Sequence, residues 1–165
     1  MSQGITDLWG AVRAWDGFEL ALSEIDEPTR GHPQIRLGHA ILWASVLNDA
    51  YWRLGRTEYV AQRDVDSDGV VIEGLRMARN ALLHGAALCA VVRPDVQLPG
   101  ITIGPWSWTS DVESLVSFLD RASDPKQRES YNTHLAGELL AAPMMRAKRW
   151  FDTAEGIWPL GPGGA

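Results

Sequence analysis

Apolar residues recur every three to four positions along most of the chain, the spacing that makes one face of a helix apolar. Short stretches rich in glycine and proline separate these periodic segments. The pattern predicts four to five helices, over residues 6–25, 34–54, 70–92, 110–119 and 124–155. Residues 94–108 lack the pattern, and we expect them to be irregular or weakly extended.

Local signals mark several helix ends. Gly55 is typical of a helix C-terminus, and residues 110–113 (Ser-Asp-Val-Glu) have the form of a capping box. Asp124 and Pro125 fit an N-cap followed by a first-turn proline. Pro143 lies inside the last predicted helix and should kink it, because proline removes a backbone hydrogen bond. The sequence therefore predicts an all-α fold: an up-and-down bundle of four to five antiparallel helices, the last long helix kinked at Pro143.

Length and composition indicate one globular domain. Of the 165 residues, 45% are hydrophobic and 22% are charged, which is enough apolar material for a proper core. We expect a single domain over residues 1–160 and a disordered tail over residues 161–165. No apolar run is long enough to span a membrane, and the first residues lack the pattern of a signal peptide. The single cysteine, Cys89, excludes an intrachain disulfide, and we expect the protein to be cytoplasmic.

The formal net charge of −6 argues against strong non-specific binding to nucleic acid, which needs a basic surface. We therefore expect no binding to DNA. A local basic patch can still bind RNA, and the cations of the last helix are the best candidates for one. We expect contacts with the RNA backbone from Arg76, Arg146, Lys148 and Arg149. The alternative is that these cations form a solvated helix face.

The third predicted helix holds an arginine, an amide and a histidine in an otherwise apolar run. Asn80 and His84 are four residues apart and therefore neighbours on the helix surface, whereas Arg79 points about 140° away from His84. One apolar stripe of this helix runs through Leu75, and a second runs through Met77 on nearly the opposite side. Because a helix that is apolar on two faces needs a second cover, we expect two copies to meet along it.

These residue types suit metal-free cleavage of RNA. A histidine with a pKa near neutrality can take a proton from a ribose 2′-hydroxyl or give one to the leaving oxygen. A guanidinium binds a phosphate bidentately and stabilises the charge that develops during transfer. We interpret His84 as the general acid or base and Arg79 as the transition-state clamp, with Asn80 orienting the imidazole or binding a phosphate oxygen. Alternatively, His84 is a hydrogen-bonded core histidine and Arg79 an exposed residue at a helix edge.

The run Arg79-Asn80-Ala81-Leu82-Leu83-His84 resembles the signature of the HEPN superfamily (higher eukaryotes and prokaryotes nucleotide-binding). That signature is an arginine, a polar residue that is often asparagine, and a histidine a few positions later, on a late helix of a small bundle. The resemblance implies a homodimer whose two motifs form one ribonuclease site, with Arg79 and His84 catalytic and Asn80 supporting. It also implies a role as a toxin or in antiviral defence, with an antitoxin or inhibitor protein as a further partner. Some members act only as nucleotide- or protein-binding modules, which is the alternative function.

Residues 64–69 open like a calcium-binding loop, with carboxylates at alternate positions and a glycine that permits a sharp turn. The twelfth position of such a loop carries a bidentate acidic residue, and here it is Leu75. An acidic turn in which Asp68 caps the third helix is the better interpretation, and we expect no metal and no other cofactor. Cys89 has no histidine four positions away, so we interpret it as a buried thiol and not as a nucleophile.

Overall fold

The structure is a computed structural model that describes residues 3–25, 33–83, 89–92, 106–117 and 124–160. These residues form the helices α1 (Gln3–Ile25), α2 (Pro33–Arg63), α3 (Val71–Leu83), α4 (Val112–Ser117), α5 (Pro125–His134) and α6 (Ala141–Ile157). Two short strands, β1 (Ala90–Val92) and β2 (Trp106–Trp108), pair in antiparallel orientation. The predicted all-α fold is confirmed. None of the helices in these ranges is long and apolar enough to cross a lipid bilayer.

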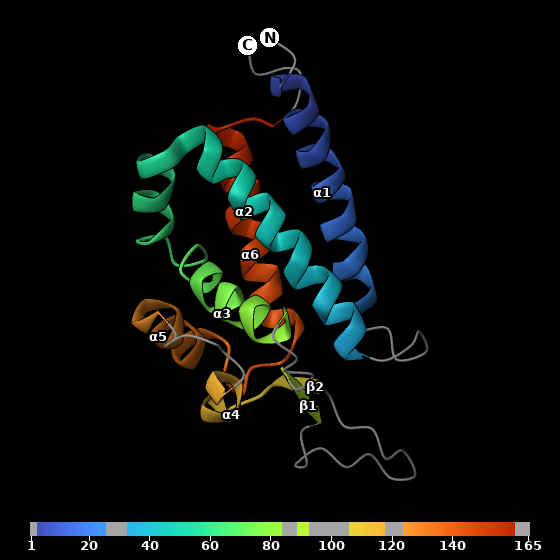
Figure 1. The fold of residues 1–165 in the computed structure, drawn as a ribbon, viewed down its shortest axis with the longest axis vertical. Coiled ribbons are helices and arrows are strands. Elements are labelled where there is room, and N and C mark those ends of the chain that lie inside the picture. Colours follow the sequence, from blue (N-terminus) through green and yellow to red (C-terminus); the bar gives the residue numbers. More distant parts are fainter. Residues whose placement is uncertain (1–2, 26–32, 84–88, 93–105, 118–123, 161–165) are drawn as a thin grey trace.

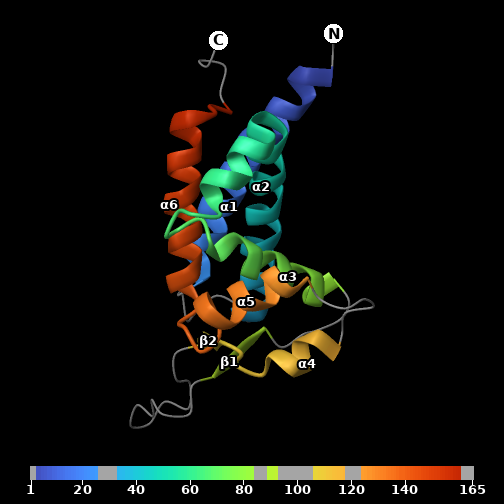
Figure 2. The same ribbon diagram turned by 90° about the vertical axis from the view of Figure 1, so that its left-hand side faces the viewer.

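The helices form two groups that pack against each other. In Figure 1, α1 lies beside α2 and α6 and runs in the opposite direction to both. The second group, α3, α4 and α5 with the two strands, lies across one end of these long helices (Figure 2). α3 joins the two groups, because it packs against α2 on one side and against α5 on the other.

Aromatic side chains form the centre of the first group. Phe18 of α1 meets Phe151 of α6 edge to face with ring centroids 5.7 Å apart, and Tyr51 of α2 stacks on the same ring at 5.8 Å. The Trp150 indole donates a 3.1 Å hydrogen bond to the Tyr59 hydroxyl. Aromatic rings bury large apolar areas in fixed geometry, so this cluster holds α6 against the α1–α2 pair.

α2 bends at the position where the sequence predicts its end. Arg56 has a non-helical backbone, with φ 45° and ψ −119°, and the helix then resumes to Arg63. A Cβ atom on Gly55 would lie 2.7 Å from Cε2 of Trp158, so the missing side chain lets Trp158 pack against the bend. Gly55 therefore marks a change of helix direction and not the end of the helix.

The third predicted helix is shorter than expected. α3 ends at Leu83, and Ala90–Val92 form strand β1 where the helix was expected to continue to Val92. In β1, Val91 pairs with Ser107 of β2. β-Branched residues suit a strand, and this pairing with a distant segment outweighs the local helical spacing of the apolar residues.

The predicted helix over residues 124–155 is two helices, and no kink occurs at Pro143. The segment between α5 and α6 bonds to β2 instead: Gly137 N donates to Trp108 O at 3.1 Å, and Leu140 N donates to Trp106 O at 3.2 Å. Gly137 has a φ of 79°, which glycine adopts without steric cost. Pro143 is the third residue of α6, in the first turn, where a missing N–H removes no helical hydrogen bond.

Candidate functional site

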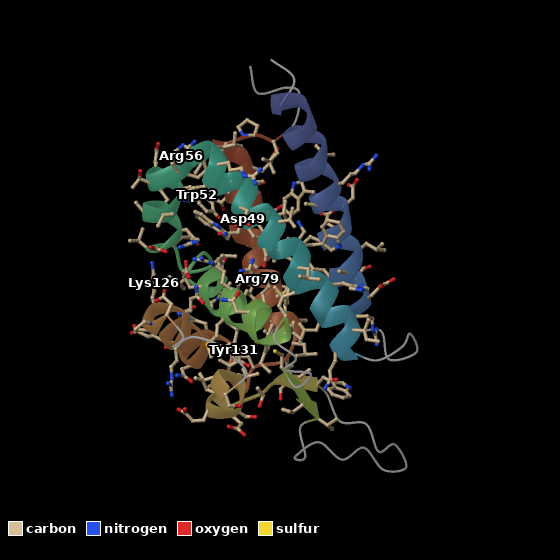
Figure 3. The ribbon with its side chains drawn as sticks, in the orientation of Figure 1. Asp49, Trp52, Arg56, Arg79, Lys126 and Tyr131 are labelled. Carbon is tan, nitrogen blue, oxygen red and sulfur yellow. The ribbon has the colours of Figure 1, made fainter. Side chains whose placement is uncertain are left out.

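α3 places Arg79 and Asn80 near its C-terminal end, both half-buried. Figure 3 labels Arg79 on this helix. The Arg79 guanidinium donates to Oδ1 of Asn80 from Nη2 at 2.8 Å and from Nε at 3.2 Å. Asn80 Nδ2 in turn donates to Oε1 of Gln127, a buried residue of α5, at 3.4 Å. Among the described residues Arg79 faces no carboxylate, so its position is held while its charge is not neutralised.

His84 lies outside the described residues, one position beyond the end of α3. The pairing of Arg79 with His84 therefore stays a prediction. The structure does show what Asn80 contacts: its amide oxygen accepts hydrogen bonds from the Arg79 guanidinium. Asn80 thus holds Arg79 in place. Its predicted roles, orienting the imidazole or binding a phosphate oxygen, stay predictions.

The two apolar faces of α3 are both covered by this chain. Leu75 and Met77 are fully buried, although they point to nearly opposite sides of the helix. On the α5 side, Gly74 N donates to Oγ of Ser130 at 2.9 Å, and a Cβ atom on Gly74 would lie 3.0 Å from Tyr131 N. α2 covers the other side. The second apolar face therefore needs no second copy to cover it, contrary to the expectation from the helical spacing.

The cations of α6 that were predicted to contact RNA are paired with carboxylates, although the side chain of Arg149 stays 55% exposed. Arg149 donates to both carboxylate oxygens of Asp68, at 2.7 and 2.8 Å, and Arg146 Nε lies 3.5 Å from the same group. Lys148 Nζ lies 3.0 Å from Oδ1 of Asp152. Contact of these side chains with RNA stays a prediction, and in this arrangement each would first have to leave a carboxylate.

A buried ion-pair cluster connects α2 with α3. The side chains of Arg63 and Glu73 are 4% and 5% exposed and are hydrogen-bonded to each other. Oδ1 of Asn48 accepts from Arg63 Nη1 at 3.2 Å and from the Tyr59 hydroxyl at 3.1 Å. Arg76, the fourth predicted RNA contact, donates from Nη1 to both carboxylate oxygens of Glu73 at 2.9 Å. The sequence analysis missed this cluster, because charged residues of one helix resemble surface residues until the fold buries them.

The acidic turn between α2 and α3 does not gather its carboxylates around a common point. Oδ1 of Asp66 accepts the backbone N–H groups of Asp68 and of the next residue, both at 2.8 Å. Asp68 binds the arginines of α6, so it does not cap α3 as predicted. Asp64 is hydrogen-bonded to Lys126 of α5. Within the described residues, no three His, Cys, Asp or Glu side chains are grouped as a metal site.

A pocket of about 260 Å³ opens between this turn and α5. Burial works against ionisation of Asp64, but hydrogen bonds from Lys126 and Arg63 outweigh it and lower the pKa of the carboxyl. Burial and the nearby Arg146 lower the pKa of His134, which keeps the imidazole neutral at pH 7. The pocket therefore presents charges of both signs and a neutral imidazole. Its lining includes Asp64, Glu73, Lys126, Ser130, Thr133 and His134, and it does not include Arg79.

Comparisons of the chain with protein-family models, with curated proteins and with solved structures gave no match. The HEPN resemblance therefore rests on the motif from Arg79 to His84 and on the helical fold. Of the predicted site residues, the structure joins Arg79 with Asn80. Arg146 and Arg149 meet at Asp68, and Arg146 also lies 3.5 Å from Nδ1 of His134 at the end of α5. Arg76, whose side chain is 39% exposed, pairs with Glu73 of the buried cluster.

Proposed function

We propose that this protein is a metal-independent endoribonuclease of the HEPN type, with a site built around Arg79 and His84. The observation that carries the proposal is the environment of Arg79. Its guanidinium is held at 2.8 Å by the neutral amide oxygen of Asn80 and faces no carboxylate in the described part of the chain. An arginine that is fixed but not neutralised is suited to binding a phosphate, whereas the arginines of α6 already pair with Asp68.

In this mechanism His84 takes the proton of a ribose 2′-hydroxyl, and the 2′-oxygen forms a bond to the adjacent phosphorus. The bond from phosphorus to the 5′-oxygen of the next nucleotide breaks, and the leaving oxygen takes up a proton. Arg79 binds the non-bridging oxygens, whose negative charge grows in the transition state. Asn80 is a positioning residue that holds the guanidinium. The products are a 2′,3′-cyclic phosphate and a 5′-hydroxyl end.

We expect the active form to be a homodimer that associates through α2. Ile35, Leu42 and Val46 are 62%, 43% and 43% exposed, and their spacing places them on one face of the helix. A row of exposed aliphatic side chains is typical of a protein interface. Leu83, the residue before His84, is also 65% exposed, so the end of α3 is open to a partner. A toxin or defence role, with an inhibitor protein as partner, is the biological setting that the resemblance implies.

The proposal is tested by incubating purified protein with single-stranded RNA in EDTA. The wild type is expected to leave 2′,3′-cyclic phosphate ends, because the attacking group is the ribose hydroxyl and not water. Arg79→Ala and His84→Ala are each expected to slow cleavage by about 10²–10⁴-fold, the range for loss of a general acid–base group or of a group that stabilises transition-state charge.

Arg13→Ala is the matched control, because Arg13 is an exposed arginine of α1 and no part of the site. It should cleave RNA at the wild-type rate. Circular dichroism establishes that each variant keeps the helical fold. A folded Arg79→Ala or His84→Ala variant that cleaves as fast as the wild type would contradict the proposal.

The pairing of the α6 cations with carboxylates favours a second candidate function, a non-catalytic binding module of the same fold. A protein whose lysines and arginines are largely ion-paired holds a polynucleotide weakly but can still hold a nucleotide or a protein segment near Arg79. This function predicts saturable binding of a nucleotide, measured by calorimetry and abolished in Arg79→Ala, with no RNA cleavage by the wild type.

A further inference from the structure

The bend of α2 carries a strained residue. Arg56, with φ 45°, is the one non-glycine residue of positive φ in the described part of the chain. Such a backbone costs free energy for any residue with a Cβ atom, and this kind of strain concentrates at functional sites. Glycine adopts the same conformation without that cost. Arginine therefore occupies a position whose backbone conformation favours glycine.

The strained position brings the Arg56 guanidinium over the indole of Trp52, 5.6 Å from the ring centroid. Trp52 is 46% exposed, in contrast to the buried Trp108 and Trp150. A guanidinium that stacks uses its flat face, which leaves its N–H donors free in the plane of the group. The pair, which we call the α2 platform, thus combines an exposed aromatic surface with hydrogen-bond donors.

The electrostatic setting of this platform favours an anionic ligand. In the described part of the chain, Arg56 contacts a neutral ring and Arg79 a neutral amide. Other cations of α3, α5 and α6 lie within 4 Å of carboxylates: Arg76, Lys126, Arg128, Arg146, Lys148 and Arg149. Because the chain has a net charge of −6, an anionic ligand is repelled except near cations that are not neutralised. Figure 3 labels Trp52 and Arg56 at the bend of α2 and Arg79 on α3.

We propose that the α2 platform binds single-stranded RNA, with one base stacked on Trp52 and the adjoining phosphate bound by Arg56. This inference rests on the proposed function, for which it names a substrate-binding site outside the motif. A single-stranded ligand is required because only an unpaired base exposes its flat face to an aromatic side chain. The phosphate contact explains why an arginine occupies the strained position, since glycine offers no donor beyond its backbone.

The experiment separates binding from cleavage. A fluorescein-labelled single-stranded RNA with 2′-O-methyl riboses has no hydroxyl to attack, so its binding in EDTA is measured by fluorescence anisotropy without turnover. Trp52→Ala is expected to weaken binding about tenfold or more, the effect of losing one stacked base. Trp52→Phe keeps a ring and should retain most of the affinity. Leu54→Ala is the control, because Leu54 is 52% exposed at the same bend and offers no ring.

Arg56→Gly gives a second and independent readout. This variant is expected to weaken RNA binding about tenfold without lowering the melting temperature, because relief of strain offsets the larger entropy of glycine in the unfolded chain. If Arg56 had only a structural role, the variant would bind RNA as the wild type does. Arg13→Ala controls for the loss of one positive charge elsewhere on the surface.

The outcomes also separate this inference from the proposed function. Wild-type affinity in both Trp52→Ala and Arg56→Gly overturns the inference, even if unmodified RNA is cleaved. Platform-dependent binding with no cleavage of unmodified RNA supports the inference and overturns the nuclease. If Trp52→Ala converts a dimer to a monomer while RNA affinity stays at the wild-type value, the platform is a contact between copies of the chain, and the inference is wrong.

Discussion

Burial determines the chemistry of the single cysteine, Cys89. Its side chain is buried, with Sγ 3.8 Å from the carbonyl oxygen of Ala78, and burial raises the pKa of the thiol to about 12. The reactive species is the thiolate, which is scarce at pH 8 when the pKa is this high. Cys89 is therefore not a nucleophile in the folded protein, in agreement with its interpretation from the sequence.

We predict that iodoacetamide at pH 8 modifies Cys89 far more slowly in the native protein than in urea. Unfolding restores both access and an ordinary thiol pKa, so the rate difference measures protection by the fold. Mass spectrometry of timed samples provides the two rates. Equal rates in the two conditions would show that the thiol is exposed.

The buried guanidinium of Arg63 depends on the carboxylate of Glu73 for charge compensation. Glu73→Gln removes a carboxylate and leaves the buried Arg63 guanidinium with Asp64 as its remaining charged partner. Breaking a buried ion pair from one side destabilises a protein by about 3–5 kcal/mol. We expect the lower end of that range, about 3 kcal/mol, from urea unfolding, because Asp64 still accepts a hydrogen bond from Arg63.

Glu113→Gln is the matched control for this prediction. Glu113 pairs with Arg128, but its side chain is 75% exposed, and exposed ion pairs contribute about 0–1 kcal/mol. A loss for Glu73→Gln as small as that for Glu113→Gln would mean that water reaches the Arg63–Glu73 pair.

At the scale of elements, the ends of helices divide into those that local sequence predicts and those that it does not. Asp124 caps α5 as predicted, with Oδ1 accepting from Lys126 N at 2.9 Å. The capping box before α4 is shifted by one residue, because Asp111 and not Ser110 accepts the N–H of Ser114, at 3.0 Å. Caps involve neighbours in the chain and are visible in the sequence. The end of α3 and the break between α5 and α6 depend on pairing with β2, which is distant in the chain.

The turn before α3 is joined to α6 by a pH-dependent contact. Hydrogen bonding from Arg149 lowers the pKa of Asp68 below its usual 3.8. A carboxyl whose folded pKa is lowered stabilises the protein above its unfolded pKa, and the effect is lost as the pH falls through the folded pKa. The contact should therefore stabilise the fold at pH 5–7 and contribute nothing once Asp68 is protonated.

We predict that Asp68→Asn lowers the urea midpoint slightly and equally at pH 7 and pH 5, and that the difference from wild type shrinks as the pH falls below 3.8. The loss is small because the pair is accessible to water. Asp16→Asn, on the exposed side of α1, is the control and should change the midpoint at no pH. A difference that grows on acidification would contradict the assignment of this ion pair.

At the scale of the whole molecule, the exposed row of Ile35, Leu42 and Val46 on α2 bears on the oligomeric state. We predict that Val46→Glu converts a dimer into a monomer, because a charge within an apolar interface is buried without a partner. Light scattering after size-exclusion chromatography gives the mass of each variant.

Leu20→Glu is the control for the dimer, because Leu20 is also an exposed aliphatic residue, at 61% against 43% for Val46, but lies on α1. It should leave the mass unchanged. A wild-type protein that is monomeric at all concentrations would show that there is no dimer. A Val46→Glu variant that stays dimeric would show that the dimer interface lies elsewhere. RNA cleavage by a monomer would further show that one chain carries a complete site.

Local sequence was enough to establish the helical fold class, the position of most helices and the cap of α5, because the periodicity of apolar residues and the caps arise from contacts within a few positions. It also singled out Arg79 and Asn80 as site residues, but not the hydrogen bonds between them. Tertiary contacts alone decided that α3 is covered on both faces, that Asp68 pairs with the two arginines of α6, and that Arg63 and Glu73 are buried. Each of these depends on which side chains from distant segments share a small volume, and a local pattern carries no information about that.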